Sequence, residues 1–141
     1  MADFIEIKTD NAFSEAFDIL YELDDRLERD RFISAMHHEL SHNSRLFAVR
    51  DSGKLVAVAA VWLLITGRFE KILWINAFVT TAKQRSQGFG SLLLSGLHGI
   101  AAEQGCSEIR VHAHRPKAIE FWRQKAGFDD FSSVLRRPVN P

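Results

Sequence analysis

The residues best suited to chemistry in this chain are an arginine and two glycines that lie between two apolar patterns. Arg85 and Gly88 lie between the strand-like run 72–79 and a helical pattern over residues 89–100, and Gly90 is the second residue of that pattern. Glycine has no Cβ, so a ligand can approach the backbone closely. The first amides of a helix have no internal partners and lie at the electropositive end of its dipole. The pattern therefore predicts a phosphate or pyrophosphate site, with the arginine as a cationic clamp.

The short glycine pattern also fits a simple turn that leads into a helix, so the site is a hypothesis at this point. The pattern is not the dinucleotide fingerprint, because Leu93 occupies the position of the third glycine. It is not a P-loop either, because no Gly-Lys-Ser/Thr sequence follows. The residues alone leave the identity of the anion open.

Two histidines are the best titratable candidates for proton transfer. His112 and His114 alternate with apolar or small residues, so both are expected to point to one face of a strand. They are the candidates for the general base, although the pattern favours the simpler interpretation, a pair of partly exposed strand histidines. The single cysteine, Cys106, excludes an internal disulfide and is interpreted as a small buried side chain.

A separate pattern suggests metal chemistry. His38, Glu39 and His42 match the His-Glu-x-x-His sequence of zinc metallopeptidases, in which two histidines one helical turn apart bind zinc. The helix is expected to end at Asn43, and no third ligand follows at the usual spacing. We therefore predict no bound metal and interpret the segment as a solvated helix face, with the metallopeptidase as a minor alternative.

Length and composition limit the class of protein. The 141 residues favour one domain, 1–141, and the 18 basic residues balance the 18 acidic ones. This balance gives no electrostatic argument for binding nucleic acid or a membrane surface. The acidic N-terminus lacks a signal segment, and the apolar run 55–65 is too short to span a bilayer as a helix. A cytoplasmic protein is the expectation.

Hydrophobic periodicity predicts an α/β fold in which a strand and two helices precede three consecutive strands. The glycine-led helix then connects two strands that are expected to be parallel. The result would be a mixed, mostly antiparallel sheet with helices on both faces. The expected strands are 4–8, 46–50, 54–64, 69–80, 109–113 and 128–135, and the helical patterns cover 12–23, 32–40, 89–100 and 116–126.

In element order and in two motifs, the chain resembles the GNAT superfamily of acetyl-CoA-dependent N-acetyltransferases. The family's acetyl-CoA signature, Arg/Gln-x-x-Gly-x-Gly/Ala, is matched by residues 85–90. The second motif, Asn-x-x-Ala-x-x-Phe-Tyr followed by Gly-Phe, is matched in part: Ala118, Phe121, Gly127 and Phe128 agree, whereas Arg115 replaces Asn and Trp122 replaces Tyr.

The resemblance implies a GNAT-like fold with about four helices and direct transfer of an acetyl group to an amine. The acceptor would be a small molecule or a peptide, and a homodimer is consistent with the family. Backbone amides over 86–91 would hold the pyrophosphate of coenzyme A, and backbone groups over 78–80 would contact its pantetheine arm. The implied cofactor-binding residues are Phe78, Val79, Thr80, Arg85, Ser86, Gln87, Gly88, Phe89, Gly90, Ser91 and Trp122.

The departure at Trp122 concerns the leaving thiolate, which the family's tyrosine often protonates. An indole is no useful acid, but releasing a thiol of pKa about 8.5 as thiolate at neutral pH costs only about 2 kcal/mol. Neutralising an amine of pKa about 10.4 costs roughly 4.6 kcal/mol, so the base matters more. Trp122 is expected to pack beneath the sulfur or to be a core residue, and a GNAT-like module that binds acyl-CoA without turnover is the alternative function.

Overall fold

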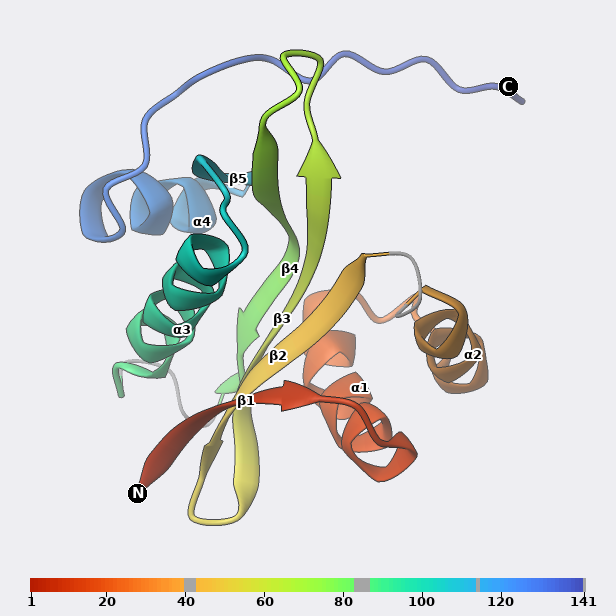
Figure 1. Ribbon diagram of the computed structural model, residues 1–141. Coiled ribbons are helices and arrows are strands. Elements are labelled where there is room, and N and C mark those ends of the chain that lie inside the picture. Colours follow the sequence, from red (N-terminus) through yellow and green to blue (C-terminus); the bar gives the residue numbers. More distant parts are fainter. Residues whose placement is uncertain (40–42, 83–86, 114, 141) are drawn as a thin grey trace. The chain divides into compact units, whose positions relative to one another are not determined.

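A five-stranded sheet in the order β1-β2-β3-β4-β5 organises the first part of the chain (Figure 1). The computed structural model describes residues 1–39, 43–82, 87–113 and 115–140, in two compact units, Met1–Val111 and His112–Pro141. The first unit holds β1 (Ala2–Ile7), α1 (Asp10–Leu23), α2 (Arg29–Glu39), β2 (Ser44–Asp51), β3 (Lys54–Ile65), β4 (Lys71–Thr80), α3 (Phe89–Glu103) and β5 (Glu108–Val111). The second holds α4 (Pro116–Glu120) and the π-helical turn η2 (Phe121–Lys125).

The strand directions agree with the sequence prediction. β1 to β4 pair with their neighbours in antiparallel fashion, whereas β5 runs parallel to β4. The turn between β2 and β3 uses Ser52 and Gly53, with φ of 51° and 84°, because a tight hairpin needs left-handed backbone there. The helix α3 provides the crossover from β4 to the parallel strand β5, as parallel pairing requires.

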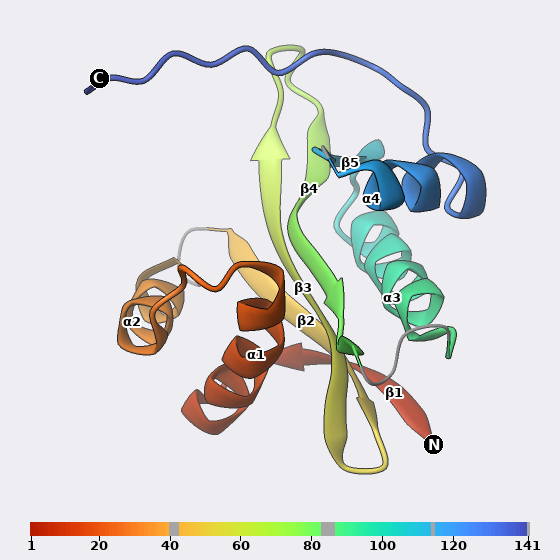
Figure 2. The same ribbon diagram turned by 180° about the vertical axis from the view of Figure 1, so that it is seen from behind.

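Helices cover both faces of the sheet, as predicted (Figures 1 and 2). On one face, α1 buries Phe13, Ala16 and Leu20 against alternate residues of the strands, and α2 packs partly buried apolar residues against the same core. On the other face, α3 buries Leu93, Leu97 and Ala101. The core on the α1 face comprises Ile7, Phe13, Ala16, Ile19, Leu20, Leu46, Ala48, Leu55, Val58 and Val79.

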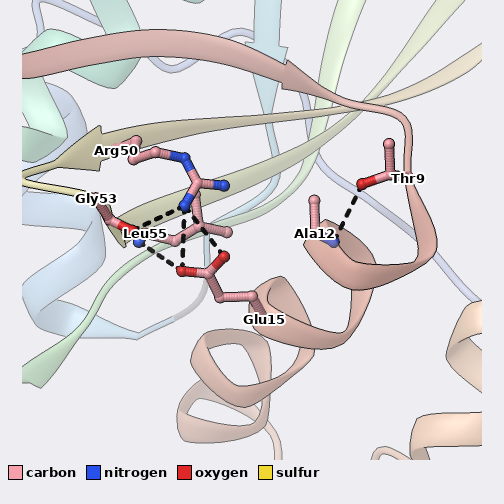
Figure 3. A network of polar contacts seen from close by, with 6 residues as sticks. All are labelled: Thr9, Ala12, Glu15, Arg50, Gly53 and Leu55. Carbon is pink, nitrogen blue, oxygen red and sulfur yellow. Dashed lines mark hydrogen bonds and ion pairs between the residues drawn. The ribbon is translucent and has the colours of Figure 1, made fainter.

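Polar contacts fix α1 against the β2–β3 hairpin (Figure 3). The Glu15 carboxylate accepts hydrogen bonds from the Leu55 amide at 2.9 Å and from the Arg50 guanidinium at 3.2 Å. Arg50 also donates to the Gly53 carbonyl at 3.1 Å. One carboxylate thus connects the helix to both strands of the hairpin.

The packing of α3 against β1 leaves no room for a side chain at Gly96. A Cβ built there would overlap the ring of Phe4, which stacks on Phe47 with centroids 5.4 Å apart. Glycine at this position therefore lets α3 approach the sheet, and a larger residue would push the helix away. This contact fixes the middle of the helix whose N-terminus is described below.

The last predicted elements differ most from the structure. β5 ends at Val111 instead of residue 113, and the predicted helix 116–126 is a short α-helix followed by a π-helical turn. Residues 128–135, all of them described, form no strand. Three apolar residues of this segment, Phe128, Phe131 and Val134, lie three positions apart, and Leu135 follows Val134 directly, so the alternation of a strand is missing. Among the described residues, no helix is long and apolar enough to cross a membrane.

Candidate functional site

The N-terminus of α3 is open. Gly88 precedes the helix in the left-handed region with φ of 81°, and no side chain caps the helix there. The first helical bond of this end joins the Leu92 amide to the Gly88 carbonyl at 3.1 Å. The amides of the three residues before Leu92 therefore have no intrahelical acceptor. They belong to Phe89, Gly90 and Ser91.

The electrostatics of this end favour an anion. The first turn of α3 contains no acidic residue, so the positive end of the helix dipole is not compensated within the helix. A Cβ added at Gly88 would meet nothing within 4 Å, so space remains beside the amides. Gln87, Gly88 and Ser91 are exposed, whereas the predicted ligands Arg85 and Ser86 lie outside the described residues.

A carboxylate of α1 holds the chain where it leaves β4. Glu22 accepts a hydrogen bond from the Ala82 amide at 2.8 Å and another from the Thr81 hydroxyl at 2.9 Å. These two residues begin the connection that leads to Gly88. The end of β4 is thus anchored to α1, on the opposite face of the sheet from α3.

A β-bulge interrupts β4 at Asn76. Ile75 pairs with Val61 and Ala77 pairs with Ala60, so the exposed Asn76 has no counterpart in β3. A bulge adds one residue to a strand and shifts the alternation of everything beyond it. The bulge lies next to the place where the described ladder between β4 and β5 ends, at the pair Ile75–Val111.

Residues 72–75 of β4 pair with β5. The bulge determines which backbone groups of the later residues of β4 point to that same edge. The Thr81 amide donates to the Val56 carbonyl at 2.9 Å, and hydrogen-bonded pairs alternate along an antiparallel ladder. The groups of Val79 therefore point to β3, and those of Phe78 and Thr80 point away from it. The Val79 side chain is buried in the α1 core. Of the three predicted contacts in β4, two thus present their backbone to this edge.

Trp122 is described within the second unit. It is 6% exposed, and its ring makes edge contacts with Phe121 and Phe128, each with centroids 5.0 Å apart. The Phe128 amide donates to the Trp122 carbonyl at 2.8 Å, and Gly127 between them has φ of 76°, in the left-handed region. These contacts give the indole a packing role within the turn.

The titratable candidates are only partly described. His112 is exposed and follows β5 directly, and His114 lies outside the described residues. Burial raises the pKa of the Cys106 thiol, although Lys71 opposes this shift, so the thiol stays protonated at neutral pH. Cys106 is half-buried and not buried as predicted, but the raised pKa of its thiol argues against a thiolate nucleophile.

The metal-like pattern falls at the edge of a gap. His38 is exposed near the end of α2, whereas His42 lies outside the described residues. Within the part of the chain that is described, no group of three His, Cys, Asp or Glu side chains could hold a metal ion. The absence of a metal remains a prediction.

Sequence reasoning missed two features of this site. The bulge had one available signal, an asparagine inside an otherwise apolar strand run, which is unusual in a regular central strand. The contact of Glu22 with Thr81 and Ala82 joins residues about sixty positions apart, and no local pattern predicts it.

Known proteins resemble this chain over nearly its whole length. The model of the acetyltransferase (GNAT) family matches residues 6–128. A curated relative, the uncharacterized N-acetyltransferase YhdJ of Bacillus subtilis (strain 168), is 26% identical over 137 residues, covering 95% of this chain and 96% of its own.

Solved structures share the fold at low sequence identity. A structure of AAC(6')-Iy in complex with a bisubstrate analogue, CoA-S-monomethyl-acetylneamine, has a TM-score of 0.84 at 12% identity and covers 100% of this chain and 99% of its own. An aminoglycoside acetyltransferase from an uncultured soil metagenomic sample, in complex with sisomicin, has a TM-score of 0.82 at 13% identity, with 99% and 97% covered. At these identities the likeness establishes the fold alone.

Proposed function

This chain belongs to the acetyltransferase (GNAT) family and is an N-acetyltransferase, and we propose that it binds acetyl-CoA between the end of β4 and the open N-terminus of α3. The family uses acetyl-CoA as the acetyl donor. The observation that carries the proposal is the uncapped start of α3, where Gly88 leaves three amides without helical partners. Because the family model spans residues 6–128 and so reaches into both units, we propose that residues 1–141 form one functional domain.

The proposed path of the donor follows from the direction of β4. The phosphates of coenzyme A lie at the start of α3, beside the carboxyl end of β4, with Arg85 as the predicted clamp. The pantetheine arm then runs back along β4, where Phe78 and Thr80 direct their backbone groups away from β3. The five steps from Thr80 to Ile75 span roughly 16 Å at about 3.3 Å per residue. This path brings the thioester to the bulge at Asn76.

The proposed reaction is direct transfer. The lone pair of the neutral amine attacks the thioester carbonyl carbon, and the carbonyl electrons move to the oxygen. A backbone amide of β4 near the bulge donates to that oxyanion, as donors aimed at developing charge do in acyl transfer. The attack forms a new C–N bond. When the carbonyl forms again, the C–S bond breaks, and the released thiolate of coenzyme A then takes up a proton from solvent. The nitrogen loses its extra proton to solvent or to a base.

Proton removal from the acceptor amine is assigned to the histidine segment after β5. His112, together with His114, is the proposed base, because histidine titrates near neutral pH. Trp122 supplies no proton, and the thiolate departs unassisted. The transfer rate is therefore expected to rise with pH as the amine or its base loses a proton.

Coenzyme A binding is the direct test. A thermal melt should shift upward with millimolar coenzyme A, since ligand at 100-fold its Kd stabilises a fold by about 2.7 kcal/mol. Adenosine, which lacks the pyrophosphate, is the matched control and should shift the melt much less. A melt that stays unchanged with coenzyme A would remove the proposed site.

Turnover separates the enzyme from a module that only binds acyl-CoA. Acetyl-CoA and a panel of primary amines should release free thiol, with acetylated amine formed in equal amount. Coenzyme A binding without acetylated product from any amine would instead favour the non-catalytic alternative.

A further inference from the structure

A row of side chains crosses the sheet beside the bulge, on the face that α1 and α2 cover elsewhere. The register places Ser44 opposite Trp62, Trp62 opposite Trp74, and Trp74 beside Arg110. Directly opposed residues share a face, so these four side chains form one line across β2 to β5. We call Trp62, Trp74 and Arg110 the tryptophan row.

The helices leave this part of the face uncovered. Along β3, Ala60 belongs to the α1 core, whereas Trp62 and Leu64, on the same face, are 42% and 37% exposed. Leu63, which points to the α3 face between them, is buried. The β3–β4 hairpin extends past α1 and α2 (Figure 2). The exposed Trp62, opposite Trp74, therefore lies just beyond the part of the face that the helices cover.

The tryptophan row lies beside the proposed reaction centre. Trp74 precedes the bulge residue Asn76 by two positions, about 7 Å along a strand. The proposed phosphate site lies at α3, on the opposite face, so coenzyme A approaches from that side. The acceptor must then reach the thioester from the face that carries the row.

We propose that the tryptophan row binds the body of the acceptor and selects primary amines attached to an aromatic ring. This inference rests on the function proposed above and names the substrate class of the same site. Flat aromatic bodies stack on indole rings with well-defined offset or edge geometry. The amine nitrogen then extends toward Asn76, where the thioester lies.

Charge on this face argues against polycationic acceptors. We consider the described residues that pair across the strands in this row and in the two neighbouring rows. Arg110 and Glu108 are the only ionisable side chains among them. Arg110 Nε donates to Glu108 Oε2 at 3.0 Å. Among these described register partners the one cation and the one anion balance, so they offer no surplus negative charge to hold a polyamine. The register partners in question are Leu46, Ala60, Ala77, Ser44, Trp62, Trp74, Arg110, Leu64, Ile72 and Glu108.

The test compares three amines in wild type and in matched variants. We expect kcat/KM for 2-phenylethylamine to exceed that for propylamine and for spermidine by at least about tenfold. Trp62→Ala should reduce this preference to about twofold, mainly through KM, whereas Trp62→Phe should keep most of it. Leu64→Ala, on the same strand and face one row further from the bulge, should leave the preference unchanged.

Binding measurements keep this result separate from the function itself. Calorimetry with coenzyme A reports the donor site, and calorimetry with 2-phenylethylamine on the coenzyme A complex reports the row. If coenzyme A binds but 2-phenylethylamine neither binds nor reacts, or if spermidine is preferred, the inference is wrong while the donor site stands. An unchanged preference in a folded Trp62→Ala protein overturns it equally. If coenzyme A fails to bind, the proposed donor site falls, and binding of 2-phenylethylamine to the protein alone, if lost in Trp62→Ala, would still support the row.

Discussion

The helices α1 and α3 begin in opposite ways. The Thr9 hydroxyl caps α1 by accepting from the Ala12 amide at 3.3 Å (Figure 3), and Asp10 lies in the first turn of this helix. Asp10 also accepts from His37 of α2 at 2.8 Å. The start of α3 instead has Gly88, no capping side chain and no acidic residue. One N-terminus is completed by its own chain, and the other is left open.

The difference teaches where to look for a ligand. A capping side chain stabilises a helix by about 1 kcal/mol, so an uncapped start gives up stability that a serine or aspartate could supply. At α3 the missing partners coincide with open space beside Gly88 and with the end of β4. A bound phosphate would supply the acceptors that α1 obtains from Thr9.

The largest expected effect is on Gly88→Val, which would place a side chain at the open end. We expect the Kd for coenzyme A to rise by at least about 100-fold, because the Cβ and branched methyls occupy the phosphate space. Gly105→Val at the other end of α3 is the matched control, since its φ of 75° and its open surroundings give a similar backbone strain. Calorimetry on both folded variants decides, and equal losses would contradict a specific phosphate site. If Gly88→Val does not fold, Gly88→Ala is measured in its place, and an unchanged Kd there contradicts the site.

The second largest effect is expected when the first turn of α3 receives a negative charge, as Asp10 provides in α1. Ser91→Asp puts a carboxylate in the first turn of α3, and we expect about tenfold weaker coenzyme A binding through repulsion of the phosphates. Ser95→Asp adds the same charge one turn later on an exposed position and should weaken binding much less. Raising the salt concentration should shrink the difference between the two variants. Equal affinities at low salt would argue against a phosphate at this helix end.

A smaller effect is expected where the chain caps itself. Thr9→Ala should lower the free energy of unfolding by about 1 kcal/mol, since the Ala12 amide loses its acceptor. Denaturant unfolding measures this loss, and the Kd for coenzyme A should stay at the wild-type value. A changed Kd would mean that the two helix ends are coupled.

The smallest effect is expected at Trp122, which belongs to neither helix end. Trp122→Phe should change kcat by less than about tenfold, or about 1.4 kcal/mol, because no side-chain acid is needed for the thiolate to leave. The rate should rise with pH in both proteins. A folded variant with normal coenzyme A affinity and a rate several orders of magnitude lower would show that the indole takes a direct part.

Sequence patterns predicted what local spacing determines. The hydrophobic periodicity that predicts α1 and the glycine pattern at the start of α3 each fix an element within a few positions, and the crossover rule gave the parallel pair β4–β5. The predicted strand at 128–135 was wrong because the segment contains apolar residues that do not alternate with polar ones. The row of Trp62, Trp74 and Arg110 depends on the register of separate strands, which no single segment encodes.

The bulge at Asn76 makes the site sensitive to chain length at a single position. Deleting Asn76 would restore regular pairing with β3 and reverse the alternation of every later residue of the strand. Phe78 would then turn into the tightly packed α1 core, and Val79 would turn out of it. Two adjacent stretches of one ribbon thus differ in how they tolerate insertions and deletions. A residue added at the exposed hairpin tip near Phe69 changes only a loop. A residue removed at Asn76 would change both the backbone groups that β4 presents at its edge and the side chains that it packs into the core.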